Sequence, residues 1–282
     1  MRISDCFAAG AQPLSFETFP PKGDLPVDQA RNVFAGLAPL DPAFVSVTYS
    51  AGGSGNSGRT VEVAQCAKDE FGLNAMAHLT CINATRESIQ AQFDAMRGAG
   101  LENVLALRGD VPADQLVNHE FKYAVDLIPL AREAGFCVGA ACYPEGHAAC
   151  LDTVADMRHM VAKQSAGAQF FVSQLFFDNQ AALRFLDRAR HAGISVPITF
   201  GIMPFLSKSQ ITRMVFMCGA SLPAPVVKLL ARWEHDPAAL RQAGIDYACQ
   251  QFVDLAAQGV DGLHVYIMNQ PDIAARVTEA LL

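Results

Sequence analysis

Two carboxylates stand where apolar, β-type runs give way to polar residues, a placement that suits proton chemistry. Glu17 lies within residues 15–19 (SFETF), where a period of two sets it on the face opposite Phe16 and Thr18. If that apolar face meets helices, Glu17 points into the interior of a barrel. A carboxylate there is costly to bury as an anion, so we favour a functional role over a structural ion pair.

Asp110 closes the second run, residues 104–112 (VLALRGDVP), in which an apolar strand breaks into Arg108, Gly109 and Asp110. At the carboxyl end of a parallel strand, the last residues and the following loop face the ligand crevice. Asp110 is equally consistent with a turn that its own side chain caps. The segment therefore predicts the mouth of a site and leaves the role of its acid open.

Other polar residues stand at or just beyond the ends of predicted strands. They are Thr48, His78, Tyr143 with His147, Gln174 and Tyr266. Each has a plainer explanation: a histidine within a strand is commonly a satisfied core imidazole, a glutamine can bond loop backbone, and a tyrosine before proline can serve packing. Their convergence is the stronger signal. The histidines show no HxH or HExxH spacing, so a metal centre is not indicated.

Eight short apolar runs separated by helical segments must position these residues. We predict strands at 15–19, 44–49, 75–80, 103–107, 137–142, 170–175, 197–201 and 263–267, with helices between them, two or three helices over 208–258 and a closing helix after Pro271. Ala-Gly pairs before four of the strands predict helix C-caps. The pattern favours a single α/β domain over residues 1–282, a (β/α)8 TIM barrel with extra helices before strand eight.

The glycine-rich segment 51–59 (AGGSGNSGR) could cradle a phosphate with backbone N–H groups. It lacks the GK[ST] ending of a P-loop and the GxGxxG spacing of a dinucleotide-binding turn. We therefore interpret it as a mobile lid, with bare flexibility as the plainer alternative.

Composition excludes several classes of partner. The formal net charge is -7 and no cluster of Lys and Arg occurs, which argues against nucleic acid. No apolar run approaches the roughly 18–20 residues of a membrane span, and the first residues lack a signal-peptide pattern, so we expect a cytoplasmic protein that does not enter membranes. The 8 cysteines are scattered without a CxxC pair and read as small buried hydrophobes.

Seven motifs in register carry a family resemblance. They are SFETFPPK at 15–22, FVSVTYSAGGSG at 44–55, AHLTC at 77–81, LRGDVP at 107–112, YPEGH at 143–147, SQLFFD at 173–178 and HVYIMN at 264–269. Together they resemble the methylenetetrahydrofolate reductases over essentially the whole chain. The resemblance implies a flavin-bearing (β/α)8 barrel, of the short bacterial type because no regulatory extension follows, acting in one-carbon metabolism and methionine biosynthesis.

The resemblance also implies chemistry: NADH or NADPH reduces FAD, which then passes hydride to 5,10-methylenetetrahydrofolate. Glu17 matches the family's general acid, which helps protonate N10 as the five-membered ring opens. Asp110 matches a residue beside the flavin and the pterin. Gln174 and Tyr266 match residues on the folate side, and Gln270 stands where some relatives carry a folate-side arginine.

The family's flavin-binding positions fall on a larger set of residues. They are Thr48, His78, Leu107, Arg108, Gly109, Asp110, Tyr143, His147, Asp156 and Lys163. On the helix after strand five, Asp156, His159 and Lys163 share one face, which can meet the ribose and pyrophosphate of FAD. Two positions of this helix depart from many relatives, which carry asparagine and arginine where this chain has His159 and Ala162.

Two other functions remain open. A cofactor-free or metal-using barrel lyase predicts a colourless protein. A non-catalytic or partner-dependent barrel subunit of a one-carbon complex is expected to lose the acid at position 17, which is present. We expect a homo-oligomer and leave open a partner subunit and the choice between NADH and NADPH.

Overall fold

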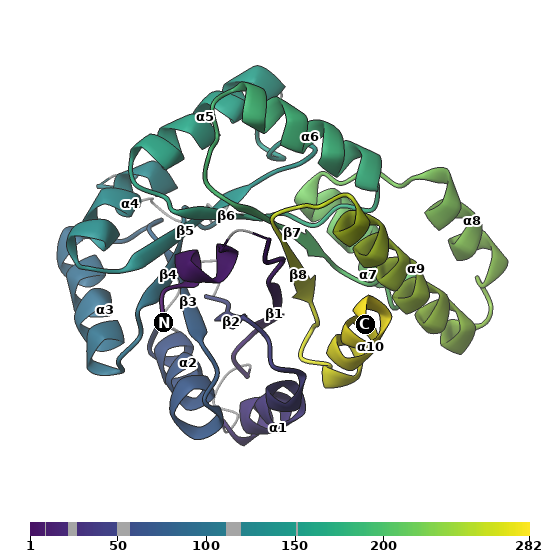
Figure 1. The fold of residues 1–282 in the computed structure, drawn as a ribbon, viewed down its shortest axis with the longest axis horizontal. Helices are drawn as coiled ribbons and strands as arrows, with labels where there is room; N and C mark the ends of the chain where they lie inside the picture. Colours follow the sequence, from purple (N-terminus) through teal and green to yellow (C-terminus); the bar gives the residue numbers. More distant parts are fainter. Residues whose placement is uncertain (9, 22–26, 50–56, 111–119, 151) are drawn as a thin grey trace.

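The strands close into a barrel in which all neighbouring pairs are parallel, which confirms the predicted (β/α)8 fold (Figure 1). The computed structural model describes residues 1–8, 10–21, 27–49, 57–110, 120–150 and 152–282. Within these ranges the strands follow each other around the barrel in chain order. They are β1 (Leu14–Thr18), β2 (Phe44–Val47), β3 (Ala75–Thr80), β4 (Asn103–Leu107), β5 (Cys137–Cys142), β6 (Phe170–Ser173), β7 (Ile198–Ile202) and β8 (Gly262–Tyr266).

The α-helices alternate with the strands and cover the outside of the barrel, and two short 3-10 helices, η1 and η2, accompany them (Figure 1). They are η1 (Ile3–Phe7), α1 (Asp28–Leu37), η2 (Ala38–Leu40), α2 (Ser57–Phe71), α3 (Arg86–Gly98), α4 (Ala124–Glu133), α5 (Thr153–Ser165), α6 (Asn179–His191), α7 (Lys208–Cys218), α8 (Ala224–Arg232), α9 (Pro237–Ala257) and α10 (Pro271–Leu281). As predicted, α7 to α9 are the extra helices before strand eight. No helix in the described ranges is long and apolar enough to cross a membrane.

Local sequence signals explain where several helices begin and end. The side chains of Asp152 and Asp178 accept hydrogen bonds from backbone N–H groups in the first turns of α5 and α6. The predicted Ala-Gly turns at 99–100, 134–135, 166–167 and 192–193 are confirmed, because each glycine has a left-handed φ directly after the helix. These turns return the chain to the amino ends of the strands.

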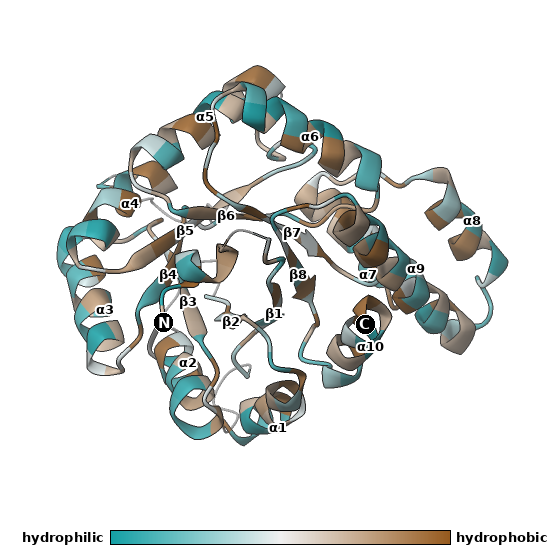
Figure 2. Cartoon of the chain, in the orientation of Figure 1, coloured by the Kyte–Doolittle hydropathy of each residue, from teal (hydrophilic) through white to brown (hydrophobic). Residues whose placement is uncertain are grey.

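Alternation along the strands divides the apolar side chains between two cores. One core fills the space between the strands and the helices and includes Phe16, Val45 and Val265. The other lies inside the barrel at its amino end and is built from Phe44, Phe170 and their neighbours. Figure 2 shows mostly hydrophobic residues along several of the barrel strands and mixed hydrophobic and hydrophilic residues along the surrounding helices. The eight cysteines are free and most are buried, as predicted.

The short helices η1 and η2 were not predicted from the sequence, and η1 is the one that contributes to the inner core. It lies across the end of the barrel that faces the viewer in Figure 1. Ile3 is fully buried in the inner core, and its N–H donates to Asn103 Oδ1 over 2.9 Å. Because η1 has five residues, it is too short to show a helical repeat in the sequence.

Two predicted strands were too long. β2 and β6 end at Val47 and Ser173, each two residues before the predicted end, because the chain turns into loops at the barrel mouth; β1 has the predicted length and lies one residue earlier in the chain. Only the last residues of the predicted lid segment 51–59 lie within the described ranges, where they begin α2.

Candidate active site

Glu17 lies on the inner wall of the barrel, as its place in the strand alternation predicted. Its Oε2 atom is 3.6 Å from His78 Nε2 on β3 and 3.7 Å from His264 Nε2 on β8. The side chain of Glu17 is 19% exposed, whereas that of His264 is 0% exposed. The carboxylate is therefore held between two buried imidazoles and keeps one edge open to solvent.

His264 was not selected as a site residue from the sequence. Its only signal is that it precedes Tyr266 by two positions, so both side chains point to the same face of β8. Its Nδ1 lies 2.7 Å from Ser15 Oγ, and its ring stacks on Phe44 with centroids 5.9 Å apart. The ring is therefore fixed on both sides.

His78 belongs to the same group. Burial lowers the pKa of His78 to about 4, although the nearby Glu17 carboxylate acts in the opposite direction. His78 is therefore neutral near pH 7. The sequence also allowed that His78 is a core imidazole with all its hydrogen bonds made. This alternative fails at Nε2, which has no hydrogen-bond partner in the described chain.

Tyr266 closes the group on the β8 side. Its hydroxyl donates to the Ser173 carbonyl over 2.5 Å, and its ring meets the His264 ring edge-on with centroids 5.3 Å apart. Gly201 makes room for it, because a Cβ at this position would lie 2.5 Å from the Tyr266 ring. Burial raises the pKa of Tyr266 well above its usual value, so its hydroxyl keeps its proton.

Arg108, Gly109 and Asp110 follow β4 at the same end of the barrel. Gly109 has a φ of +86°, and Arg108 Nε donates to its carbonyl over 3.1 Å. Asp110 is exposed. Burial raises the pKa of the Cys218 thiol to about 11 and the Asp110 carboxylate adds to that rise, so Asp110 lies within electrostatic reach of the end of α7.

A cavity of about 280 Å³ opens beside this mouth, near the lower end of the roughly 300–1,000 Å³ usual for small-molecule sites. Its lining includes seven residues expected from the sequence to border a flavin: Leu107, Arg108, Tyr143, His147, Asp156, His159 and Lys163. The structure thus brings together residues from the ends of β4 and β5 and from α5. Of the remaining flavin candidates, His78 belongs to the group around Glu17, Gly109 and Asp110 follow β4, and Thr48 N donates to Thr18 O between β2 and β1.

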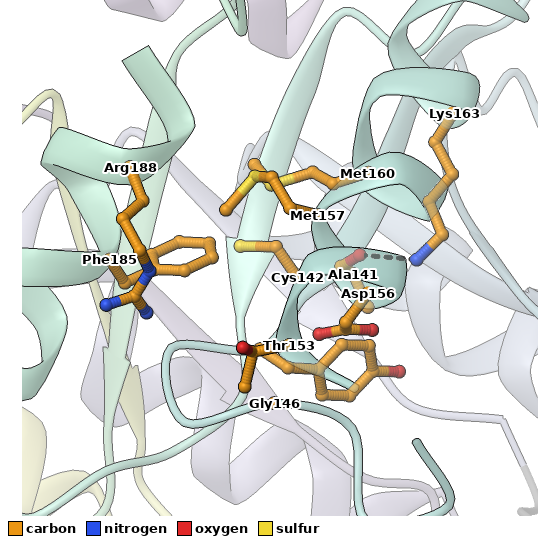
Figure 3. A pocket seen from close by; sticks show the side chains of 11 residues that line it. Ala141, Cys142, Gly146, Thr153, Asp156, Met157, Met160, Lys163, Phe185 and Arg188 are labelled. Atoms are coloured by element: carbon orange, nitrogen blue, oxygen red, sulfur yellow. Dashed lines mark hydrogen bonds between the residues drawn. The ribbon is translucent and has the colours of Figure 1, made fainter. Parts of the chain in front are cut away.

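Lys163 and Asp156 are the charged residues that α5 directs toward β5 (Figure 3). Lys163 Nζ donates to the Ala141 carbonyl over 2.8 Å and lies 5.5 Å from the centre of the Tyr143 ring. Burial lowers the pKa of Lys163. Asp156 Oδ2 accepts the N–H of His147 over 3.3 Å, which ties α5 to the loop after β5. This wall offers a cation beside an acid.

The aromatic and imidazole rings of the cavity have fixed orientations. His147 and Tyr143 meet edge-on with centroids 4.6 Å apart, and His147 Nδ1 accepts the N–H of Ala149 over 3.0 Å. Nε2 therefore carries the proton of the neutral His147 ring. Burial lowers the pKa of His147, so the neutral form is the one present near pH 7. The exposed His159 stacks on Tyr123 with centroids 6.2 Å apart.

Within the described chain, one group of side chains has the spacing of metal ligands. Cys150, Asp156 and His159 each offer a ligand atom, and these atoms lie within 4.8 Å of one another in the same cavity. Lys163 lines the same cavity with a positive charge that disfavours a cation.

Two residues expected on the folate side are partly occupied by local contacts. Gln174 Oε1 accepts a hydrogen bond from the backbone N–H of Leu175 over 2.8 Å. This is the bond to loop backbone that the sequence left open as the plainer role of Gln174. The oxygen of the side-chain amide is therefore engaged locally, and its NH2 group points away from this bond. Gln270 Oε1 accepts a hydrogen bond from Arg241 over 2.8 Å at the start of α10. The structure therefore does not join Gln270 to the group around Glu17.

Comparisons with known proteins give one family. A family model described as methylenetetrahydrofolate reductase matches residues 2–281. The chain is 34% identical over 269 residues to the 5,10-methylenetetrahydrofolate reductase of Escherichia coli K12, covering 95% of this chain and 90% of that protein. The enzyme of the same name from Pectobacterium carotovorum is 33% identical, with 95% and 89% covered.

A plant relative and a solved structure extend these findings. The Arabidopsis thaliana protein called methylenetetrahydrofolate reductase (NADH) 1 is 32% identical over 95% of this chain and 48% of its own length. A Clostridium thermocellum protein described as binding two copies of 5-methyl-5,6,7,8-tetrahydrofolic acid has a TM-score of 0.66 at 13% identity, covering 95% of this chain and 94% of that one. At that identity the likeness supports the fold alone.

Proposed function

This chain belongs to the methylenetetrahydrofolate reductase family, whose members are oxidoreductases acting on methylenetetrahydrofolate, and we propose that it uses FAD and NADH or NADPH to form 5-methyltetrahydrofolate. The observation that carries the proposal is the Glu17 carboxyl, held between two buried imidazoles at the mouth of a barrel. A cavity lined by the partly buried Lys163 opens beside it. A site of this kind can join a proton donor to a bound hydride carrier.

The cavity residues fit FAD. Lys163 and Arg108 supply positive charge for a pyrophosphate, and Lys163 keeps donor capacity beyond its bond to the Ala141 carbonyl. Asp156 can accept hydrogen bonds from ribose hydroxyls. Leu107, Ala141 and Tyr143 provide apolar surface for a ring system. When bound, the flavin would supply the hydride that the protein side chains cannot carry.

Glu17 would act as general acid. Oε2 of Glu17 faces two imidazole nitrogens, which can stabilise a proton on the carboxyl. The exposed edge of the same carboxyl faces the mouth, where it can pass that proton to a bound substrate. We assign its proton to N10 of the folate as the five-membered ring opens. The charge of Asp110 and the NH2 group of Gln174 would orient the pterin, with Tyr266 lining the folate side.

The alternative function is a non-catalytic or partner-dependent barrel subunit of a one-carbon complex. Such a subunit has no use for a proton donor. The retained acid and its two imidazoles favour the reductase.

The test is a spectrum of the purified protein followed by two anaerobic additions. We expect a yellow protein that bleaches on addition of NADH or NADPH and regains its colour when methylenetetrahydrofolate is added. A colourless protein that takes up no added FAD, or a flavin that neither nucleotide reduces, would refute the reductase. A flavin that is reduced but not reoxidised by the folate would favour the non-catalytic alternative.

A further inference from the structure

The group around Glu17 contains more proton-binding atoms than a lone general acid needs. The Nε2 atoms of His78 and His264 lie 3.6 Å and 3.7 Å from Glu17 Oε2, and neither has a hydrogen-bond partner in the described chain. Buried polar atoms are nearly always paired, so two such nitrogens directed at one carboxyl call for an explanation. The explanation lies in where their protons sit.

Ser15 determines the proton on His264. The Ser15 hydroxyl has one hydrogen, and its oxygen lies 3.1 Å from the Leu263 carbonyl and 2.7 Å from His264 Nδ1. Both contacts are hydrogen bonds only if Ser15 donates to the carbonyl and accepts from Nδ1–H. In the neutral ring Nδ1 then carries the proton, and Nε2 presents a lone pair to Glu17. An ionised carboxylate facing that lone pair is repelled unless a proton lies between them.

We propose that Glu17 and His264 act as a pair that shares one proton, and that His264 is a positioning residue which keeps Glu17 loaded when the folate arrives. This inference rests on the proposed function. An isolated carboxyl releases its proton near pH 4.3 and an isolated imidazole near about 6.5, so a pair holds its proton to higher pH than a carboxyl alone.

The other side chains that face Glu17 and His264 do not compete for the shared proton. His78 on β3 is neutral near pH 7, because burial lowers its pKa to about 4. Tyr266 on β8 keeps its own proton, because burial raises its pKa well above the usual value. Phe44 on β2, which stacks on His264, does not titrate.

The geometry excludes a relay through Ser15. Its hydroxyl ends at a backbone carbonyl, which has no proton to give, and both Ser15 and His264 are fully buried. During turnover the Glu17 O–H bond breaks and the folate N10–H bond forms, leaving a carboxylate opposite neutral His264. The pair then takes one proton from water through the exposed edge of Glu17.

The test compares both half-reactions of the FAD-loaded enzyme over a pH range. His264→Asn places an amide nitrogen near the position of Nδ1, which preserves the contact with Ser15 and removes Nε2. We expect nucleotide-driven flavin reduction to be unchanged, while the folate step falls about tenfold or more near about pH 8 and recovers to within a few-fold only near about pH 4.5, where a lone carboxyl is itself protonated.

Two further variants complete the test. Ser46→Ala is the matched control, because Ser46 pairs in register with Glu17, is buried, and its hydroxyl has no partner in the described chain; we expect the wild-type profile. Ser15→Ala keeps His264 and removes the hydroxyl that fixes its tautomer, together with the hydrogen bond to the Leu263 carbonyl, and should give a smaller shift of the same sign.

Several outcomes would overturn the pair. These are a His264→Asn variant with a wild-type profile, a loss of equal size at every pH, or an equal loss of both half-reactions. If His264→Asn does not fold, Ser15→Ala decides, and a wild-type profile for it refutes the inference. A wild-type enzyme that fails the folate step at every pH refutes the proposed function instead.

Discussion

Gly201 and Gly98 test the packing of the mouth, because alanine should have opposite effects at these positions. A Cβ at Gly201 would lie 2.5 Å from the Tyr266 ring, 2.7 Å from its hydroxyl and 2.7 Å from the Ser173 carbonyl. Overpacking of this kind costs about 1–3 kcal/mol. Displacing the Tyr266 hydroxyl also loses a hydrogen bond worth about 0.5–1.5 kcal/mol. We expect Gly201→Ala to lower the free energy of unfolding by about 2–4 kcal/mol.

Gly98 is the matched control at the exposed end of α3. A Cβ there meets no atom within 4 Å, so Gly98→Ala should raise the free energy of unfolding by about 0.5–1 kcal/mol. Urea unfolding followed by circular dichroism gives both values. Because Gly201→Ala also moves Tyr266, it should slow the folate half-reaction, whereas Gly98→Ala should not. A Gly201→Ala protein as stable as the wild type would refute the packing described for the mouth.

Three further predictions concern charge and protonation. Lys163→Met should weaken FAD binding about 10- to 100-fold, as measured by flavin fluorescence, because it removes a positive charge from the cavity. Lys68→Met, at a surface lysine outside the cavity, is the control and should bind FAD as the wild type does. An equal loss in both variants would contradict the role of Lys163 in binding FAD. Folded His78 titrates near pH 4 and an unfolded histidine near 6.5, so the unfolded chain binds more protons in that window. Stability should fall by roughly 3 kcal/mol as pH drops through it, with a smaller fall in His78→Asn. Asp261→Asn should cost about 1 kcal/mol, because Asp261 pairs with Arg190, and an unchanged urea midpoint would contradict this.

The sequence predicted the barrel because each βα unit carries its own signals. Apolar runs mark the strands, and Ala-Gly turns mark the helix ends. The inward direction of Glu17 followed from a period of two in the same way. These local patterns predict the fold correctly because parallel strands that are buried on both faces have few alternative ways to pair.

Features that depend on distant residues could not be predicted. His264 meets Glu17 only because barrel closure brings β8 beside β1, across 247 positions of the chain. The hydrogen bond between Gln270 and Arg241 joins α10 to α9, which no spacing in the sequence reveals. The placement of η1 depends on Asn103, a partner on β4.

The most direct test of the central claim separates hydride uptake from proton delivery in a Glu17→Gln variant. The amide keeps the size of the side chain and removes the acid. Stopped-flow spectra should show flavin reduction by the nucleotide at the wild-type rate and reoxidation by methylenetetrahydrofolate slowed about 100- to 10,000-fold. Exposed Glu102→Gln is the control and should match the wild type in both steps. Equal slowing of both steps, or unimpaired reoxidation, would contradict the role of Glu17 as the acid of this site.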